Sequence, residues 1–382
     1  MKIQLPDACG SLANYNLIGS PLKPTNLTQN SARVFYAAAH VVPDPLSRDD
    51  PTEAASIDWE STLTFRRYLA ELGLGIAEAM DTAQRGMGLD WENALRLIRH
   101  TREDLPNALV ANGCGTDHLN PSETQTLENV QRAYLDQVEA VQKIGGRVIL
   151  MASRALCRVA KHRDDYISLY RNVLSSCDSP VILHWLGDMF DPQLAGYWGS
   201  RQFELALETC LAIISENVSK IDGIKLSLLD SKKEIVMRRR LPETVKMYTG
   251  DDFNFPELIA GDEFGFSHAL LGIFDPLATV AVHAANKLSA GDNHGFREIL
   301  DPTVPLARHI FCAPTQHYKT GVVFLAWLNG FQNHFIMVNG AQSSRSLPYF
   351  IDCFKLSDQC GLFRDPDLAI DRMRHLLKIY GL

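Results

Sequence analysis

The sequence predicts an α/β protein built as a closed (β/α)8 barrel. From residue 32 onward, short apolar segments alternate with amphipathic ones. The apolar segments are nearly continuous, as is typical of strands buried on both faces of a parallel sheet. With 382 residues, 46% of them hydrophobic, the chain can fill a large core. Eight strands separated by helices close most simply into a barrel.

The eight expected strands are residues 33–39, 75–80, 108–112, 147–152, 180–185, 223–228, 245–249 and 264–270. The helices expected between them have apolar residues at three- and four-residue spacing. They are residues 59–72, 90–100, 123–144, 165–175, 201–216, 232–240 and 276–289. Two further helices are expected at 317–329 and 367–380.

The expected domain organisation has three parts. Residues 1–30 are rich in Asn, Pro and Ser without a sustained period, which predicts an arm packed on the surface. Residues 31–290 form the barrel. Residues 291–382 form a helical extension packed on it.

Composition excludes several classes of partner. Lys and Arg number 37 against 45 Asp and Glu, giving a net charge of -8 without a basic stripe, so we expect no nucleic acid partner. There is no signal-like start and no apolar run of about 18 residues, so we expect neither export nor membrane insertion. Eight cysteines without a CxxC pair indicate reduced, mostly buried thiols. We expect a cytoplasmic homo-oligomer that acts on a small molecule.

A nucleotide cofactor is not expected. Gly113 and Gly115 form a Gly-x-Gly sequence after the third strand. This sequence lacks the third glycine and the acidic residue about twenty positions later that a dinucleotide site requires. Cys114 between the two glycines has no base located beside it by the sequence, so we expect it to serve packing.

Polar residues gather where the expected strands end, and in such barrels the chemistry lies at the carboxyl ends of the strands. They are His40, Glu78, Asp81, Thr82, Asp117, His118, Ser153, Arg154, His184, Lys225, Asp251, Asp252 and His268. This concentration predicts a site for a small polar or anionic substrate.

Lys225 is the first candidate catalytic residue, because it interrupts the apolar sequence Ile221-Asp-Gly-Ile-Lys-Leu-Ser. Burial lowers the pKa of a lysine, and a neutral amine attacks a carbonyl group to form a Schiff base. Alternatively, the amine pairs with a carboxylate or reaches solvent.

Gly223-Ile224-Lys225 resembles the strand-six motif of the dihydrodipicolinate synthase and N-acetylneuraminate lyase family of class I aldolases. Residues 249–252 (Thr-Gly-Asp-Asp) and 179–183 (Ser-Pro-Val-Ile-Leu) resemble that family's seventh and fifth strands, and the likeness extends over residues 32–285. The resemblance implies a (β/α)8 barrel and a Schiff base on Lys225. The longer chain indicates a divergent branch.

Two departures from the family matter for the chemistry. His184 stands where the family has a tyrosine that moves protons, so we expect His184 to transfer protons in its place. Alternatively, His184 is only hydrogen-bonded inside the barrel. The family's carboxylate-binding loop falls on residues 81–85, where Thr82 alone is retained.

The expected substrate-binding residues are Asp81, Thr82, Asp117, Arg154, Asp252 and His268. Carboxylates bind sugar hydroxyls well and repel a free acid, unless Arg85 or Arg154 offsets the charge. We therefore expect a neutral, polyhydroxylated compound, such as a sugar or keto-sugar, in preference to pyruvate.

Two other functions stay open. In one, His40, Glu78, Asp117, His184 and His268 would bind Zn²⁺ or Mn²⁺ in a hydrolase or isomerase, although no pair has the spacing of a known metal motif. Lys225 would then act electrostatically or as an acid or base. In the other, the barrel binds its ligand without turnover.

Overall fold

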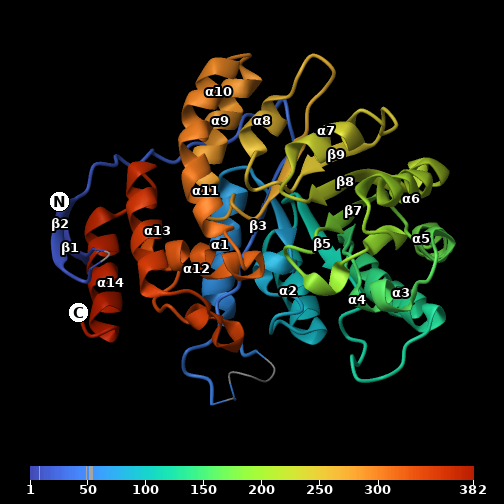
Figure 1. The fold of residues 1–382 in the computed structure, drawn as a ribbon, viewed down its shortest axis with the longest axis horizontal. Helices are drawn as coiled ribbons and strands as arrows, with labels where there is room; N and C mark the ends of the chain where they lie inside the picture. Colours follow the sequence, from blue (N-terminus) through green and yellow to red (C-terminus); the bar gives the residue numbers. More distant parts are fainter. Residues whose placement is uncertain (8, 49, 51–54) are drawn as a thin grey trace.

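Eight parallel strands close a barrel in the computed structural model, which describes residues 1–7, 9–48, 50 and 55–382 (Figure 1). The order around the barrel is β10-β3-β4-β5-β6-β7-β8-β9. The strands are β3 (Phe35–Ala38), β4 (Gly75–Glu78), β5 (Val110–Cys114), β6 (Arg147–Leu150), β7 (Val181–Leu186), β8 (Ile221–Ser227), β9 (Lys246–Thr249) and β10 (His268–Leu271). The predicted fold class is confirmed.

Helices surround the barrel and continue beyond it. The barrel helices are α1 (Trp59–Glu71), α2 (Trp91–Asp104), α3 (Leu127–Lys143), α4 (Arg154–Val159), α5 (Arg163–Ser175), α6 (Phe203–Glu216), α7 (Ser231–Arg238), α8 (Phe255–Ala260) and α9 (Ala278–Ser289). After them come α10 (Asn293–Leu300), α11 (Val304–Ile310), α12 (Tyr318–Leu328), α13 (Leu347–Gln359) and α14 (Pro366–Ile379). Side-chain caps at Asp58, Asp90 and Thr126 start α1, α2 and α3.

Large side chains fill the barrel toward the starts of the strands, and small ones leave room toward their ends. The rings of Tyr36 and Tyr248 meet edge to face at 6.0 Å. A Cβ on Gly75 would lie 2.6 Å from the Tyr36 ring, so glycine is required there. Ala38 and Ala77, near the ends of β3 and β4, face the same interior. This gradient leaves space at the carboxyl ends.

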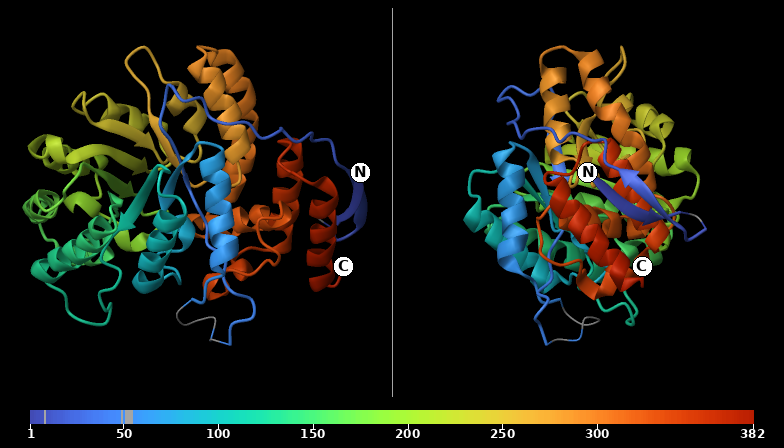
Figure 2. Two further views of the ribbon diagram at one scale, coloured as in Figure 1. Left: turned by 180° about the vertical axis from the view of Figure 1, so that it is seen from behind. Right: turned by 90° about the vertical axis from the view of Figure 1, so that its left-hand side faces the viewer.

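The two ends of the chain pack against each other, away from the barrel (Figure 2). Strands β1 (Lys2–Pro6) and β2 (Leu12–Asn16) form an antiparallel hairpin. The Tyr15 hydroxyl donates to Asp358 on α13 at 2.8 Å, and the backbone amides of Ile18 and Gly19 donate to the same carboxylate. Residues 1–30 therefore contain a hairpin that the sequence pattern did not reveal. The domain boundaries at 30 and 290 remain a prediction.

The last barrel strand begins later than expected. Residues 264–270 were expected as strand eight, whereas β10 spans His268–Leu271. Asp262 and Gly265 instead form a turn, in which Gly265 has a φ of 150°. This shift moves His268 to the start of its strand.

All eight cysteines have free thiols, four of them buried. In the described part of the chain, no helix combines the length and hydropathy needed to cross a membrane.

Candidate active site

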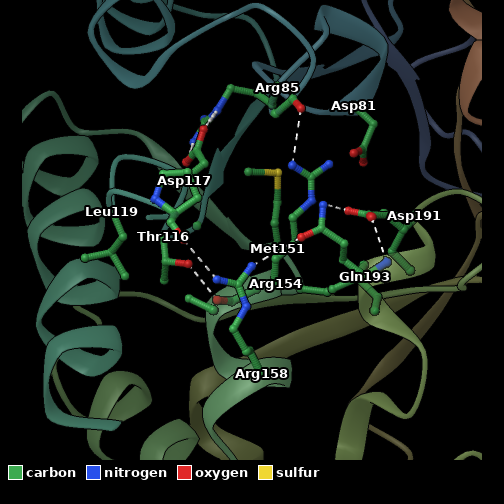
Figure 3. A pocket seen from close by; sticks show the side chains of 18 of the residues that line it. Asp81, Arg85, Thr116, Asp117, Leu119, Met151, Arg154, Arg158, Asp191 and Gln193 are labelled. Carbon is green, nitrogen blue, oxygen red and sulfur yellow. Dashed lines mark hydrogen bonds and ion pairs between the residues drawn. The ribbon is translucent and has the colours of Figure 1, made fainter. Parts of the chain in front are cut away.

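A cavity of about 400 Å³ opens at the carboxyl ends of the barrel strands (Figure 3). It is lined from β4 through β7 by the loops that follow those strands. The residues that matter for its chemistry are Asp81, Arg85, Thr116, Asp117, Ser153, Arg154, Arg158, His184, Asp191 and Gln193. The cavity therefore lies where a (β/α)8 barrel carries its active site.

Lys225 lies inside the barrel on β8, at the position paired with His184 of β7, which lines the cavity. The side chain is buried, and no hydrogen bond or ion pair to its amine occurs among the described residues. Burial lowers the pKa of Lys225, while the carboxylates of Asp81 and Asp252 partly oppose that effect. A buried amine with a lowered pKa and no fixed partner can act as a nucleophile.

Gly250 makes the space that Lys225 occupies. A Cβ at Gly250 would lie 2.8 Å from Lys225 Cε and 2.2 Å from Ser227 Oγ. The position directly after β9 must therefore be glycine for the lysine to keep its path.

His184 lies on β7, paired in register with Lys225 on β8. Its Nε2 lies 3.2 Å from Ser227 Oγ, and its Nδ1 is buried without a partner. Burial, reinforced by the charge of Lys225, holds the pKa of His184 well below 6.5. The imidazole is thus neutral at neutral pH, and His184 is one of the residues that line the cavity.

Asp81 and Asp252 supply the negative charge around Lys225. Asp252 is buried after β9 and accepts a hydrogen bond from the Ile273 amide at 2.8 Å. Burial raises the pKa of Asp252 to about 7, even though Lys225 and backbone amides favour its charged form. Asp81 opens the short 3-10 helix Asp81–Ala83 and lines the cavity.

Thr82 contacts a residue that sequence reasoning did not select. Its hydroxyl lies 2.8 Å from the hydroxyl of Tyr318, the first residue of α12. Helix α12 was expected, but nothing in the sequence shows that its first turn reaches the barrel. The sequence does contain an indirect indication that this helix is buried. Lys319 is the single charged residue of the helix, and it is buried among apolar neighbours.

Asp117 is bound internally by Arg85. Arg85 Nε donates to Asp117 Oδ2 at 2.8 Å, and Nη2 donates to the other carboxylate oxygen. Arg85 also donates to the carbonyl oxygens of Ala79 and Gly113 and to Gln137. Burial alone would raise the pKa of Asp117, but Arg85 outweighs it and lowers the pKa to about 2. The hydrogen-bond donors of Arg85 are thus bound to groups of the protein itself.

Only some of the hydrogen-bond donors of Arg154 are used within the protein. Its Nε donates to Asp191 Oδ2 at 2.5 Å, and Nη1 donates to the Gly86 carbonyl oxygen at 3.3 Å. Among the described residues its Nη2 has no hydrogen-bond partner, and the side chain lines the cavity. Of the two arginines considered for a substrate carboxylate, Arg154 is the one with a donor left.

The expected placement of His268 is wrong. Because His268 opens β10, it lies at the amino end of the barrel. Its Nδ1 accepts a hydrogen bond from the Val34 amide at 2.9 Å, and its ring packs on Tyr248 and Phe266. Lys225, His184, Asp81, Thr82, Asp117, Arg154 and Asp252 lie toward the other end, so His268 does not join them.

The five residues considered as metal ligands do not converge. His40 bonds Asp275 at 2.7 Å, and Glu78 faces outward to Arg66 at 2.7 Å. Asp117 is paired with Arg85, and His268 lies at the opposite end of the barrel. Across the described residues, no three His, Cys, Asp or Glu side chains are grouped to hold a metal ion. The arrangement does not fit a metal centre.

The fold is that of a dihydrodipicolinate synthase type of barrel. The structure superposes with a TM-score of 0.67 on YagE, a prophage protein of the dihydrodipicolinic acid synthase family from E. coli K12 solved with pyruvate. That match has 13% identity over 87% of this chain and 99% of YagE. A dihydrodipicolinate synthase from Thermotoga maritima gives 0.64 and 15% identity, covering 86% and 99% of the two chains. A putative dihydrodipicolinate synthetase from Pseudomonas aeruginosa gives 0.66 and 13%, covering 86% and 99%.

The sequence itself belongs to a different group. Residues 3–382 match the family described as "Protein of unknown function (DUF993)", so the chain belongs to that family. A search of curated proteins finds no match. The chain therefore shares the dihydrodipicolinate synthase fold, as the resemblance of its motifs implied.

Proposed function

We propose that this protein is a lyase that binds a carbonyl substrate as a Schiff base on Lys225. The observation that carries this proposal is the Lys225 amine, which is buried with a lowered pKa and no fixed partner among the described residues, on the strand position paired with the cavity-lining His184. A lysine placed only for packing or pairing would have a carboxylate within ion-pair distance. Lys225 instead has carboxylates near enough to influence its pKa and none bound to it.

The proposed chemistry begins with addition of Lys225 Nζ to the substrate carbonyl carbon. The carbonyl oxygen leaves as water and an imine forms. The protonated imine withdraws electrons from the neighbouring carbon, so a C–H or C–C bond to that carbon can break and leave an enamine. His184, neutral and with Nδ1 unused, accepts or returns the proton in this step.

The substrate that suits the cavity is a hydroxylated carbonyl compound derived from a sugar. Asp81 offers carboxylate acceptors near enough to influence Lys225, and Thr82 offers a hydroxyl from the opposite side of the barrel. Asp117 and Asp191 are paired with arginines, which lessens their repulsion of an acid. Sugar acids therefore join keto-sugars and sugar lactones as candidates, and we expect plain pyruvate to bind more weakly than these. Homo-oligomeric assembly and a cytoplasmic location remain predictions.

Borohydride reduction tests the proposal. Purified protein is incubated with a panel of keto-sugars, sugar acids and 2-oxo acids, reduced, digested and analysed by mass spectrometry. We expect a reduced adduct on Lys225 that is absent in Lys225→Ala. His184→Ala should still form the adduct, with turnover slowed by about 10² to 10⁴.

The other outcomes of this experiment distinguish the proposed lyase from a barrel that only binds a ligand. An adduct that persists in Lys225→Ala would refute the assignment. If no compound is trapped but sugars raise the unfolding temperature, the barrel binds ligand without this chemistry.

A further inference from the structure

Tyr318 is a buried polar residue that the proposed chemistry has not yet used. It begins α12, outside residues 32–285, where the sequence resembles the aldolase family. Its ring stacks on Phe311 at 4.3 Å and meets Phe190 edge to face at 6.1 Å. These contacts fix the ring and direct its hydroxyl toward Thr82 at 2.8 Å.

The Tyr318 ring lies over the end of β10. Gly272 directly follows that strand, and a Cβ there would lie 3.1 Å from Tyr318 Cε2 and 3.5 Å from Thr82 Oγ1. The next residue, Ile273, donates its amide to Asp252. Tyr318 and Thr82 therefore sit at the mouth of the barrel beside Asp252.

The order of strands places this pair across the barrel from Lys225. Thr82 follows β4 and Lys225 lies on β8, four strands apart in a ring of eight. His184, on the neighbouring β7, approaches from Lys225's own side. The carboxylates of Asp81 and Asp252 influence the pKa of both Lys225 and Tyr318, and Asp81 also lines the cavity, so both residues lie within electrostatic range of the same two carboxylates.

Tyr318 is held in its protonated form. Burial, followed by the charge of Asp81, raises its pKa well above 10. When Thr82 donates to the phenol oxygen, the phenol O–H is free to point at a bound substrate. A hydroxyl so placed can give a proton to a leaving oxygen.

We propose that the segment after the barrel completes the active site by supplying Tyr318 as the proton donor to the leaving oxygen of the substrate. The inference rests on the proposed Schiff base. His184 takes the proton from the carbon next to the imine as the C–H bond breaks. The C–O bond then breaks, the oxygen takes the Tyr318 proton and leaves as water. The phenolate, hydrogen-bonded by Thr82, regains the proton that His184 accepted, so none is consumed.

The test uses Tyr318→Phe, with Tyr349→Phe as the matched control. Tyr349 is another buried tyrosine of the same segment, and its hydroxyl donates to the Ile310 carbonyl oxygen at 3.3 Å. With a compound trapped by the wild-type protein, three quantities are measured: the Lys225 adduct, exchange of the neighbouring C–H with D₂O, and loss of the leaving group.

We expect Tyr318→Phe to keep the adduct and the exchange, and to lose elimination by about 10²-fold or more. Thr82→Val should slow the same step about tenfold, and Tyr349→Phe should behave as wild type. Because a merely structural role would lower adduct, exchange and elimination together, the split between them is diagnostic.

Elimination in Tyr318→Phe equal to that in Tyr349→Phe would overturn the inference while leaving the Schiff base intact. Equal loss of all three quantities would also overturn it. A wild-type protein that traps no compound would instead remove the proposed function, and this inference with it. If Tyr318→Phe fails to fold, Thr82→Val provides the test, because it too should slow elimination while keeping the adduct and the exchange.

Discussion

His184 and Lys225 occupy paired positions on β7 and β8, and both are buried at the carboxyl end of the barrel. The charge of Lys225 adds to burial in holding down the pKa of His184. Neither side chain has a carboxylate bound to it among the described residues. Two neighbouring bases whose pKa values are both lowered are suited to attack a carbonyl and to accept a proton.

Asp252→Asn should lower the pH at which Lys225 reacts. The Asp252 charge stabilises the ammonium form, so its removal lowers the pKa of Lys225. The readout is the rate at which a 1,3-diketone forms a vinylogous amide with Lys225, measured from pH 5 to 10. Asp81→Asn should shift the curve in the same direction.

The pH dependence of the Lys225 reaction in the wild-type protein provides a second test. Because the pKa of Asp252 is about 7, wild type and Asp252→Asn should differ above pH 7 and converge below it. Asp188→Asn removes the same charge at an exposed position and serves as the control. A shift of Asp252→Asn toward higher pH would contradict the electrostatic account.

Gly250→Ala should damage the site without removing any functional group. The added methyl would overlap Ser227 Oγ and press on Lys225 Cε, so the lysine must leave its path. We expect adduct formation on Lys225 to fall at least tenfold. Gly115→Ala is the matched control, because a Cβ there meets only the flexible end of Met151 at 3.3 Å. Equal trapping in both variants would show that Lys225 does not need this space.

The barrel could be predicted from the sequence because strands buried on both faces produce continuous apolar runs, which are visible along the chain. Lys225 and His184 stood out for the same reason, as polar residues interrupting those runs. His268 looked equivalent to them, but the turn at Asp262–Gly265 shifts its strand by several residues and reverses its place. Because the strand has only four residues, a shift of this size moves a residue from one end of the strand to the other.

Tyr318 could not be found in this way. Its place depends on how the segment after α9 folds back over the barrel, and that path is set by long-range packing with Phe311 and Phe190. The short helices α4 and α8 were also missed, because six residues are too few to show a helical period.

Glu78→Ala should cost about 3 to 5 kcal/mol of unfolding free energy, the usual cost of breaking a buried ion pair. Glu78 accepts hydrogen bonds from Arg66 at 2.8 and 2.7 Å, from Thr101 at 2.7 Å and from the Ala79 amide at 2.9 Å. Its loss would leave Arg66, which is fully buried, without a counter-charge.

This pair also holds the turn that leads to Asp81 and Thr82. Ala79 has a φ of 53°, in the left-handed region that non-glycine residues avoid. The control is Glu208→Ala, which breaks the exposed pair with Arg240 and should cost far less stability than Glu78→Ala. Urea unfolding measures both, and similar losses in the two variants would contradict this assignment.

Lys319→Met should make the protein more stable at pH 7. Lys319 is buried, and its amine contacts Met87 Sδ and the Gln316 carbonyl oxygen, both at 3.2 Å, and lies 4.8 Å from the centre of the Tyr318 ring, without a carboxylate bound to it among the described residues. Burial lowers its pKa from 10.5 to about 8, so the folded state carries the ammonium at a penalty of roughly 3 kcal/mol at neutral pH. Methionine fills similar volume without that penalty.

The sign of the pH dependence provides the check. Between about pH 8 and 10.5 the unfolded chain binds the Lys319 proton and the folded chain does not, so this group makes stability rise with pH. The advantage of Lys319→Met should therefore be largest at pH 7 and shrink by pH 10, as measured by urea unfolding. Lys378→Met, at an exposed position on α14, should show no such trend. A Lys319→Met protein less stable than wild type at pH 7 would mean that the ammonium is bound more tightly than these contacts indicate.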